Sequence, residues 1–147
     1  MIYFPRFSGY LMVHSQYVTW IDIENSVQIV SKKILNLSKN FSSISTVSRG
    51  GLIPSRLLAD SLGIEKIFVD QKTISSESLV VDDIFDTGKT FSNLLSKASN
   101  PSEFTFVTLF ARRGMNFPEQ LIYGNQTLDD SYVVFPWDKF EFEKSVK

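Results

Sequence analysis

The stretch from Leu79 to Thr90, which reads Leu-Val-Val-Asp-Asp-Ile-Phe-Asp-Thr-Gly-Lys-Thr, constrains the fold of this chain more than any other. Its apolar start, Leu79–Val81, predicts a buried β-strand that ends in the adjacent carboxylates of Asp82 and Asp83. Apolar residues after Thr90 are spaced as on one face of a helix. The stretch therefore predicts a strand that turns directly into a helix, which is typical of α/β folds.

The turn of this stretch carries groups that can bind a phosphorylated sugar. Backbone N–H groups at a helix N-terminus attract an anion, and Thr87 and Thr90 add hydroxyl donors. The carboxylates of Asp82, Asp83 and Asp86 suit sugar hydroxyls or a metal ion. An ordinary acid-rich loop with capping threonines is the alternative, but three acids at this spacing favour a binding site. A Walker-type P-loop is excluded, because Gly-x-x-x-x-Gly-Lys does not occur.

The same stretch resembles the phosphoribosyl-pyrophosphate motif of the type I phosphoribosyltransferases. The resemblance implies that Asp82 and Asp83 hold ribose hydroxyls, that Asp83 also contacts Mg²⁺, and that Asp86 is the general base at purine N7. It also implies a set of residues that bind the 5′-phosphate: Thr87, Gly88, Lys89 and Thr90. The expected reaction transfers the 5-phosphoribosyl group from phosphoribosyl pyrophosphate to a 6-oxopurine and releases pyrophosphate, with Mg²⁺ as cofactor.

Composition limits the class of protein. At 147 residues, with 43% hydrophobic and 14% aromatic residues, the chain is expected to form a single domain over residues 1–147, which the resemblance implies is a phosphoribosyltransferase domain. A formal charge of −1 favours neither nucleic acid nor a membrane as a partner. Cysteine is absent and His14 is the only histidine, which excludes thiolate zinc sites and multi-histidine clusters; His14 is interpreted as a packing or surface residue. No segment is long enough to span a bilayer, so we expect a cytoplasmic protein.

A second glycine-bearing turn, Ser48-Arg49-Gly50-Gly51, lies between a predicted strand, Ile44–Val47, and a predicted helix, Leu52–Leu62. Two glycines let backbone N–H groups curl around an anion, and Arg49 adds a fork of donors. A tight strand-to-helix turn is the alternative for this motif taken alone. Followed by Leu-Ile-Pro, the motif resembles the pyrophosphate loop of family members that use xanthine, guanine or hypoxanthine. The resemblance implies that Arg49 and Gly50 bind pyrophosphate.

The remaining apolar pattern predicts alternating strands and helices. A helix is expected after Thr19, which can cap it together with Asp22, because apolar residues recur every three or four positions from Ile23 to Leu37. Further short strands are predicted at three places: Ile67–Val69, Phe104–Phe110 and Leu121–Tyr123. This alternation predicts a parallel sheet with helices on both faces and with both glycine-bearing turns at the carboxyl ends of strands.

The base pocket is expected from two segments in the C-terminal part of the chain. The family has a basic residue just after a late strand, where this chain has Arg112, and that residue donates to the 6-oxo group of a purine. The segment Asp129–Asp138 resembles the family's base-binding segment, in which Tyr132 would stack on the purine and Val133 would offer backbone groups to its edge. Trp137 is expected to anchor this segment in the core.

The aromatic-rich N-terminal arm, residues 1–17, and the C-terminal segment are expected to form a small hood over the ligand edge of the sheet. Only a short polar segment, Asp70–Ser78, occupies the place where the family usually has a longer mobile lid. Two other functions therefore stay open: a non-catalytic homologue or regulator that binds phosphoribosyl pyrophosphate or a nucleotide, and a transferase for a different nucleobase. The resemblance also implies a homo-oligomer, either a dimer or a tetramer, and a contact between Asp138 and a metal-bound water.

Overall fold

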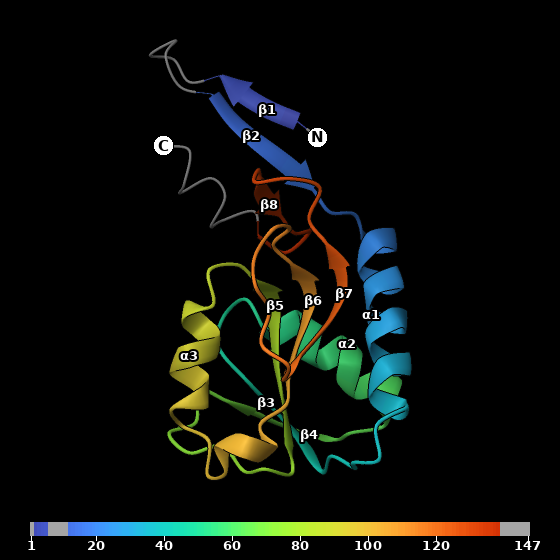
Figure 1. The fold of residues 1–147 in the computed structure, drawn as a ribbon. Coiled ribbons are helices and arrows are strands. Elements are labelled where there is room, and N and C mark those ends of the chain that lie inside the picture. Colours follow the sequence, from blue (N-terminus) through green and yellow to red (C-terminus); the bar gives the residue numbers. More distant parts are fainter. Residues whose placement is uncertain (1, 6–11, 139–147) are drawn as a thin grey trace.

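In the computed structural model, which describes residues 2–5 and 12–138, five parallel strands form the central sheet. Their order across the sheet is β4-β3-β5-β6-β7 (Figure 1). The strands have these bounds: β3, Ser43–Thr46; β4, Lys66–Val69; β5, Ser78–Phe85; β6, Phe106–Ala111; and β7, Leu121–Gln126. Strand β5 occupies the centre, so loops from strands on both sides converge at its carboxyl end.

Helices cover both faces of this sheet, as the sequence predicted. They are α1, Trp20–Leu35, and α2, Leu52–Leu62, on one face, and α3, Lys89–Leu95, on the other (Figure 1). Along β5, Leu79 and Val81 lie in the core beneath α1 and α2, whereas Val80 lies in the core beneath α3. Successive side chains of a strand point to opposite faces, so a strand covered on both faces requires an unbroken apolar run.

Several element boundaries differ from the predicted ones, among them those of β5, β6 and α1. Strand β5 continues through Asp82 to Phe85, because β6 pairs with it along this stretch. Strand β6 begins at Phe106 rather than at Phe104, because a 3₁₀ turn, η1 (Pro101–Glu103), ends there with a hydrogen bond from Phe104 N to Pro101 O of 3.3 Å. Helix α1 ends at Leu35, before Leu37.

The start of α1 has the predicted capping box. The hydroxyl of Thr19 accepts from Asp22 N at 3.1 Å, and Thr19 N donates to the carboxylate of Asp22 at 2.9 Å. These two bonds satisfy backbone N–H groups that a helix start otherwise leaves without partners. Among the described residues, no helix is both long and apolar enough to cross a membrane.

A separate three-stranded sheet forms the predicted hood, beyond the carboxyl ends of the central strands (Figure 1). It contains β1 (Ile2–Pro5), β2 (Met12–Tyr17) and β8 (Tyr132–Val134), in the order β1-β2-β8. Strand β2 pairs antiparallel with β1 and parallel with β8. The N-terminal arm therefore supports the strand that carries Tyr132 and Val133.

Candidate active site

Two adjoining cavities open at the carboxyl end of β5 and share Asp83, Ile84 and Asp86 in their walls. The larger has a volume of about 680 Å³ and lies beneath the hood, and the smaller has a volume of about 160 Å³. The larger cavity is lined by these sequence-predicted site residues: Arg49, Gly50, Asp83, Asp86, Arg112, Tyr132 and Val133. The smaller is lined by the remaining ones: Asp82, Thr87, Gly88, Lys89 and Thr90. The fold thus brings every predicted site residue to one place.

The paired acids at the end of β5 form the boundary between the cavities. Asp82 is buried, and its Oδ1 accepts from Asp83 N at 2.8 Å, while Asp83 Oδ1 accepts from Ile84 N at 2.7 Å. Burial raises the pKa of Asp82 to about 6, against the lowering effect of its hydrogen bonds with Asp83. Burial, followed by the charge of Asp82, raises the pKa of Asp83 well above its usual range. The pair therefore disfavours carrying two full negative charges without a cation.

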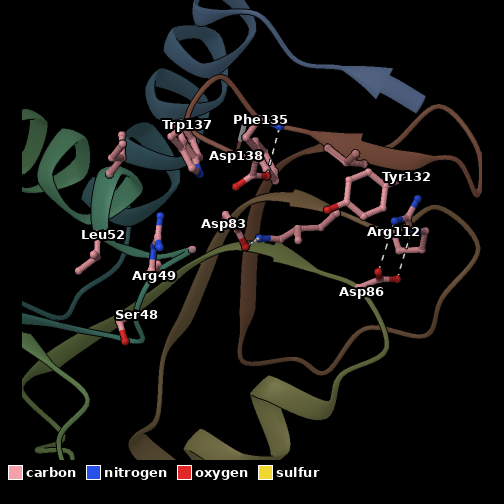
Figure 2. Close-up of a pocket in the computed structure, with 14 residues that line it drawn as sticks. Ser48, Arg49, Leu52, Asp83, Asp86, Arg112, Tyr132, Phe135, Trp137 and Asp138 are labelled. Carbon is pink, nitrogen blue, oxygen red and sulfur yellow. Dashed lines mark hydrogen bonds and ion pairs between the residues drawn. The ribbon is translucent and has the colours of Figure 1, made fainter. Parts of the chain in front are cut away.

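The glycine-rich turn after β3 packs directly against these acids. A Cβ atom on Gly50 would lie 2.7 Å from Asp83 Oδ2, and one on Gly51 would collide with Thr46 Oγ1 and lie 2.9 Å from Val81 O. Both positions therefore require glycine because of close approach rather than because of unusual dihedral angles. The Ser48–Arg49 peptide bond in this turn is cis. Figure 2 shows Asp83 between Arg49 on one side and Asp86 on the other.

The turn between β5 and α3 forms the wall of the smaller cavity. Gly88 has φ +88°, a conformation that side-chain-bearing residues rarely adopt. A Cβ atom there would also lie 3.1 Å from the ring of Phe85. Thr87 Oγ1 accepts from Lys89 N at 3.4 Å, which bends the turn toward the helix start. The result is a short loop with backbone N–H and hydroxyl groups along the wall of a cavity of about 160 Å³.

Asp86 and Arg112 form an ion pair at the far end of the larger cavity (Figure 2). Arg112 Nε donates to Asp86 Oδ1 at 3.0 Å and Nη2 donates to Oδ2 at 3.3 Å. Arg112 Nη1 donates to the carbonyl oxygens of Asp129 and Ser131 at 3.1 and 2.7 Å. A guanidinium has five N–H groups, so one on Nη2 remains for a ligand once the described partners are counted. The sequence predicted both residues for the site but not their contact.

Two buried polar residues that sequence reasoning missed shape the loop before Tyr132. Thr127 is fully buried; its Oγ1 donates to Asp129 O at 2.9 Å and accepts from Arg113 N at 3.1 Å. Gln16 of the hood accepts from Leu128 N at 2.8 Å through its Oε1. No sequence signal marked them, since an isolated Thr or Gln in a polar stretch is ordinary. The hydrogen bonds of Thr127 and Gln16 help to fix the loop whose carbonyl oxygens accept hydrogen bonds from Arg112.

The C-terminal segment closes the cavity with aromatic rings. The Tyr132 side chain is 38% exposed and lines the cavity, whereas Val133 is buried. Trp137 stacks on Phe135, with ring centroids 5.0 Å apart and planes 2° apart, and packs against the main core, as predicted. The Asp138 carboxylate accepts from Phe135 N at 3.3 Å, so it helps to shape the segment that it ends.

Known proteins are similar to this chain in sequence and in fold, although no protein-family model matches the chain. The chain is 28% identical over 152 residues to a xanthine-guanine phosphoribosyltransferase of Gluconobacter oxydans, with 86% of each protein covered. A purine phosphoribosyltransferase structure from Pyrococcus horikoshii superposes with a TM-score of 0.67 and 23% identity, covering 85% of this chain and 94% of that one. A Helicobacter pylori xanthine-guanine-hypoxanthine phosphoribosyltransferase structure gives a TM-score of 0.69 and 16% identity, covering 90% and 99%.

The chain is similar in sequence to purine phosphoribosyltransferases over most of its length and has the type I phosphoribosyltransferase fold.

The similarity to this family implies Mg²⁺, and the acids of the site suit this ion. Mg²⁺ usually binds through one or two carboxylates, with waters and substrate phosphates completing its shell. Across residues 2–5 and 12–138, no group of three or more acidic, histidine or cysteine side chains could enclose a metal ion. A carboxylate pair whose pKa values are raised by burial gains most from a nearby cation. Asp83, which borders both cavities, therefore has the chemistry of a Mg²⁺ ligand shared with substrate.

The segment Asp70–Ser78, which stands where the similar enzymes are expected to have a lid, leads from β4 to the start of β5. Ile74 is buried beneath α3, and Ile74 N donates to Lys97 O at 2.9 Å. Ser99 N in turn donates to Ile74 O at 2.9 Å. The segment connects β4 to β5 past the intervening strand β3, and the hydrogen bonds of Ile74 fix its middle in place. It therefore serves as a crossover connection.

Proposed function

We propose that this chain transfers the 5-phosphoribosyl group from phosphoribosyl pyrophosphate to a 6-oxopurine, namely guanine, xanthine or hypoxanthine, and releases pyrophosphate. One observation carries the proposal: two glycine turns, the adjacent acids Asp82 and Asp83 and the Asp86–Arg112 pair surround one pair of adjoining cavities. The names of the relatives, which specify xanthine, guanine and purine, support the same substrate class.

Each wall of the cavities is assigned to one part of the substrate. The turn Thr87–Thr90 would hold the 5′-phosphate through N–H and hydroxyl groups, and Arg49 with Gly50 would hold pyrophosphate. Asp82 and Asp83 would accept hydrogen bonds from the ribose hydroxyls. C1′ becomes cation-like as pyrophosphate leaves, so the main contribution of these residues is to position the two reactants and stabilise charge.

Asp83 would hold Mg²⁺ together with oxygen atoms of phosphoribosyl pyrophosphate, as the chemistry of the paired acids allows. The ion would neutralise charge on the leaving pyrophosphate. Asp138 remains a proposed contact to a water of that ion. A homo-oligomer, either a dimer or a tetramer, also remains part of the proposal.

The base would lie under the hood between Tyr132 and the Asp86–Arg112 pair. Asp86 is the proposed acceptor of the proton from N7, and Arg112 keeps its carboxylate in a fixed orientation. The remaining Nη2 hydrogen of Arg112 would donate to O6. Tyr132 would stack on the purine, and backbone groups of Val133 would contact its edge.

The direct test is turnover with phosphoribosyl pyrophosphate, Mg²⁺ and a panel of guanine, xanthine, hypoxanthine, adenine, uracil and orotate. We expect release of pyrophosphate and formation of the nucleotide with the 6-oxopurines. Turnover confined to adenine or a pyrimidine would contradict the base assignment. Binding of phosphoribosyl pyrophosphate without turnover on any base would favour the second candidate, a non-catalytic binding protein. The Asp70–Ser78 connection favours this candidate, because the hydrogen bonds of Ile74 fix it in place and only the hood is then left to exclude water from the site.

The 5′-phosphate assignment predicts a selective loss of affinity in Gly88→Val and Thr90→Ala. Valine is strained at φ +88° and would meet the Phe85 ring, and alanine removes one hydroxyl donor. We expect guanosine monophosphate to bind about tenfold more weakly to either variant, while free guanine binds within about twofold of wild type. Calorimetry with both ligands checks this, and equal losses for nucleotide and base would contradict the assignment.

A further inference from the structure

The turn Ser48–Gly51 is held from the edge of the sheet by Asp70, the residue that follows β4. Asp70 Oδ1 accepts from Ser48 N at 2.9 Å, and Oδ2 accepts from Ser48 Oγ at 2.5 Å. Asp70 N donates to Thr46 O at 2.9 Å, at the end of β3. Ser48 itself lines the larger cavity next to Arg49 and Gly50. Asp70 thus fixes the turn at Ser48, directly before Arg49 and Gly50, the residues proposed to bind pyrophosphate.

The backbone of Asp70 shows that a side chain is needed at this position. Its φ is +53°, and it is the one non-glycine residue with positive φ among residues 2–5 and 12–138. Glycine adopts this left-handed conformation most easily, and aspartate tolerates it only at some conformational cost. Glycine would be less strained at this position, yet the chain has an aspartate, and both of its carboxylate oxygens accept hydrogen bonds from Ser48. These bonds are therefore the reason that a side chain is needed here.

The negative charge of Asp70 also indicates that this residue orders the turn. Its two hydrogen bonds from Ser48 lower the pKa of the carboxyl group, so it is ionised near neutral pH. A negative charge beside an anion-binding turn repels the anion, which an uncharged acceptor would avoid. Ionised acceptors make the stronger hydrogen bonds, however, so a carboxylate orders the turn better.

We propose that Asp70 is a positioning residue for pyrophosphate: it fixes Ser48, and through Ser48 it holds the N–H groups of the turn and Arg49 in the geometry that receives the anion. The proposal rests on the proposed function of this turn. It predicts that loss of Asp70 weakens ligands that carry pyrophosphate and spares those that do not. A nucleoside monophosphate fills the other walls of the site and therefore serves as the reference ligand.

Two substitutions test this. Asp70→Gly removes both acceptors and relieves the backbone, and we expect the KM for phosphoribosyl pyrophosphate and the Kd of pyrophosphate with Mg²⁺ to rise about tenfold. Asp70→Asn keeps one acceptor oxygen and should fall between glycine and wild type. For both variants, the KM for guanine and the Kd of guanosine monophosphate should stay within about twofold of wild type.

Asp60→Asn is the matched control, because it also removes one exposed carboxylate, on α2, where Asp60 pairs with Arg56. It should leave all four constants unchanged. Ser48→Ala removes the hydroxyl partner, and when it is combined with Asp70→Gly it should add almost nothing to the effect of Asp70→Gly alone, since both changes break one interaction. Thermal unfolding of each variant verifies that it is folded.

Unchanged pyrophosphate binding in folded Asp70→Gly would overturn the proposal. So would equal weakening of pyrophosphate and guanosine monophosphate, which is the signature of a general structural role. Wild-type protein that binds phosphoribosyl pyrophosphate without turnover would refute the proposed reaction, yet calorimetry of the variants would still decide the role of Asp70. Wild-type protein that binds neither pyrophosphate nor phosphoribosyl pyrophosphate would overturn both.

Discussion

Replacing Asp86 by asparagine should lower kcat by about a hundredfold to ten-thousandfold, the usual contribution of a general base. Asparagine keeps the size of the side chain but cannot accept a proton from purine N7. The carboxylate is held by Arg112 through two bonds and is half exposed, so it stays oriented while one face remains open to the base. Steady-state kinetics with guanine and phosphoribosyl pyrophosphate measure the loss.

Nucleotide binding provides the control for Asp86→Asn. Guanosine monophosphate already carries the glycosidic bond and needs no proton acceptor, so its Kd should change far less than kcat. The amide must present its one oxygen to Arg112, and a small rise in Kd is expected from the weaker pair. Near-normal turnover in the variant would remove Asp86 from its proposed role.

Arg112→Ala should lower kcat/KM for 6-oxopurines by about tenfold to more than a hundredfold. The ratio of kcat/KM for 6-oxopurines to kcat/KM for adenine should fall as well. A guanidinium only donates hydrogen bonds, so its remaining N–H suits O6 and opposes the N6 amino group of adenine. An unmatched buried polar group costs about 1–3 kcal/mol. The variant also leaves Asp86 and two loop carbonyl groups without their donor, so kcat should fall as well.

Two further variants separate these effects of Arg112. Arg112→Lys keeps a donor and a positive charge but cannot bridge Asp86 and the loop at once, so it should retain the preference for 6-oxopurines while losing part of kcat. Tyr132→Ala removes stacking, which every purine shares, and should weaken all purines alike. Competition assays with hypoxanthine, guanine, xanthine and adenine measure the order of preference among purines for each variant. An unchanged ranking in Arg112→Ala would refute the base assignment, while the phosphoribosyl site could still stand.

Much of the site could be predicted because each motif is local. The acids and the turn proposed for the 5′-phosphate lie within Leu79–Thr90, and the turn proposed for pyrophosphate lies within Ser48–Gly51. In a parallel sheet the carboxyl ends of adjacent strands share one edge, so placing both turns after strands was enough to bring them together. The hood was also expected, although the parallel pairing of β2 with β8 was not.

The sequence by itself predicted the helices, the five strands of the central sheet and the glycine-bearing turns between them, because these depend on residue type and short-range spacing. Tertiary structure alone decided which polar groups from distant parts of the chain meet. Arg112 reaches Asp86 across 26 positions, Asp70 reaches Ser48 across 22, and Gln16 reaches Leu128 across 112. Such hydrogen bonds require atoms to lie within about 3 Å at favourable angles. Strand register and loop path set those distances, and residue spacing along the chain does not encode them.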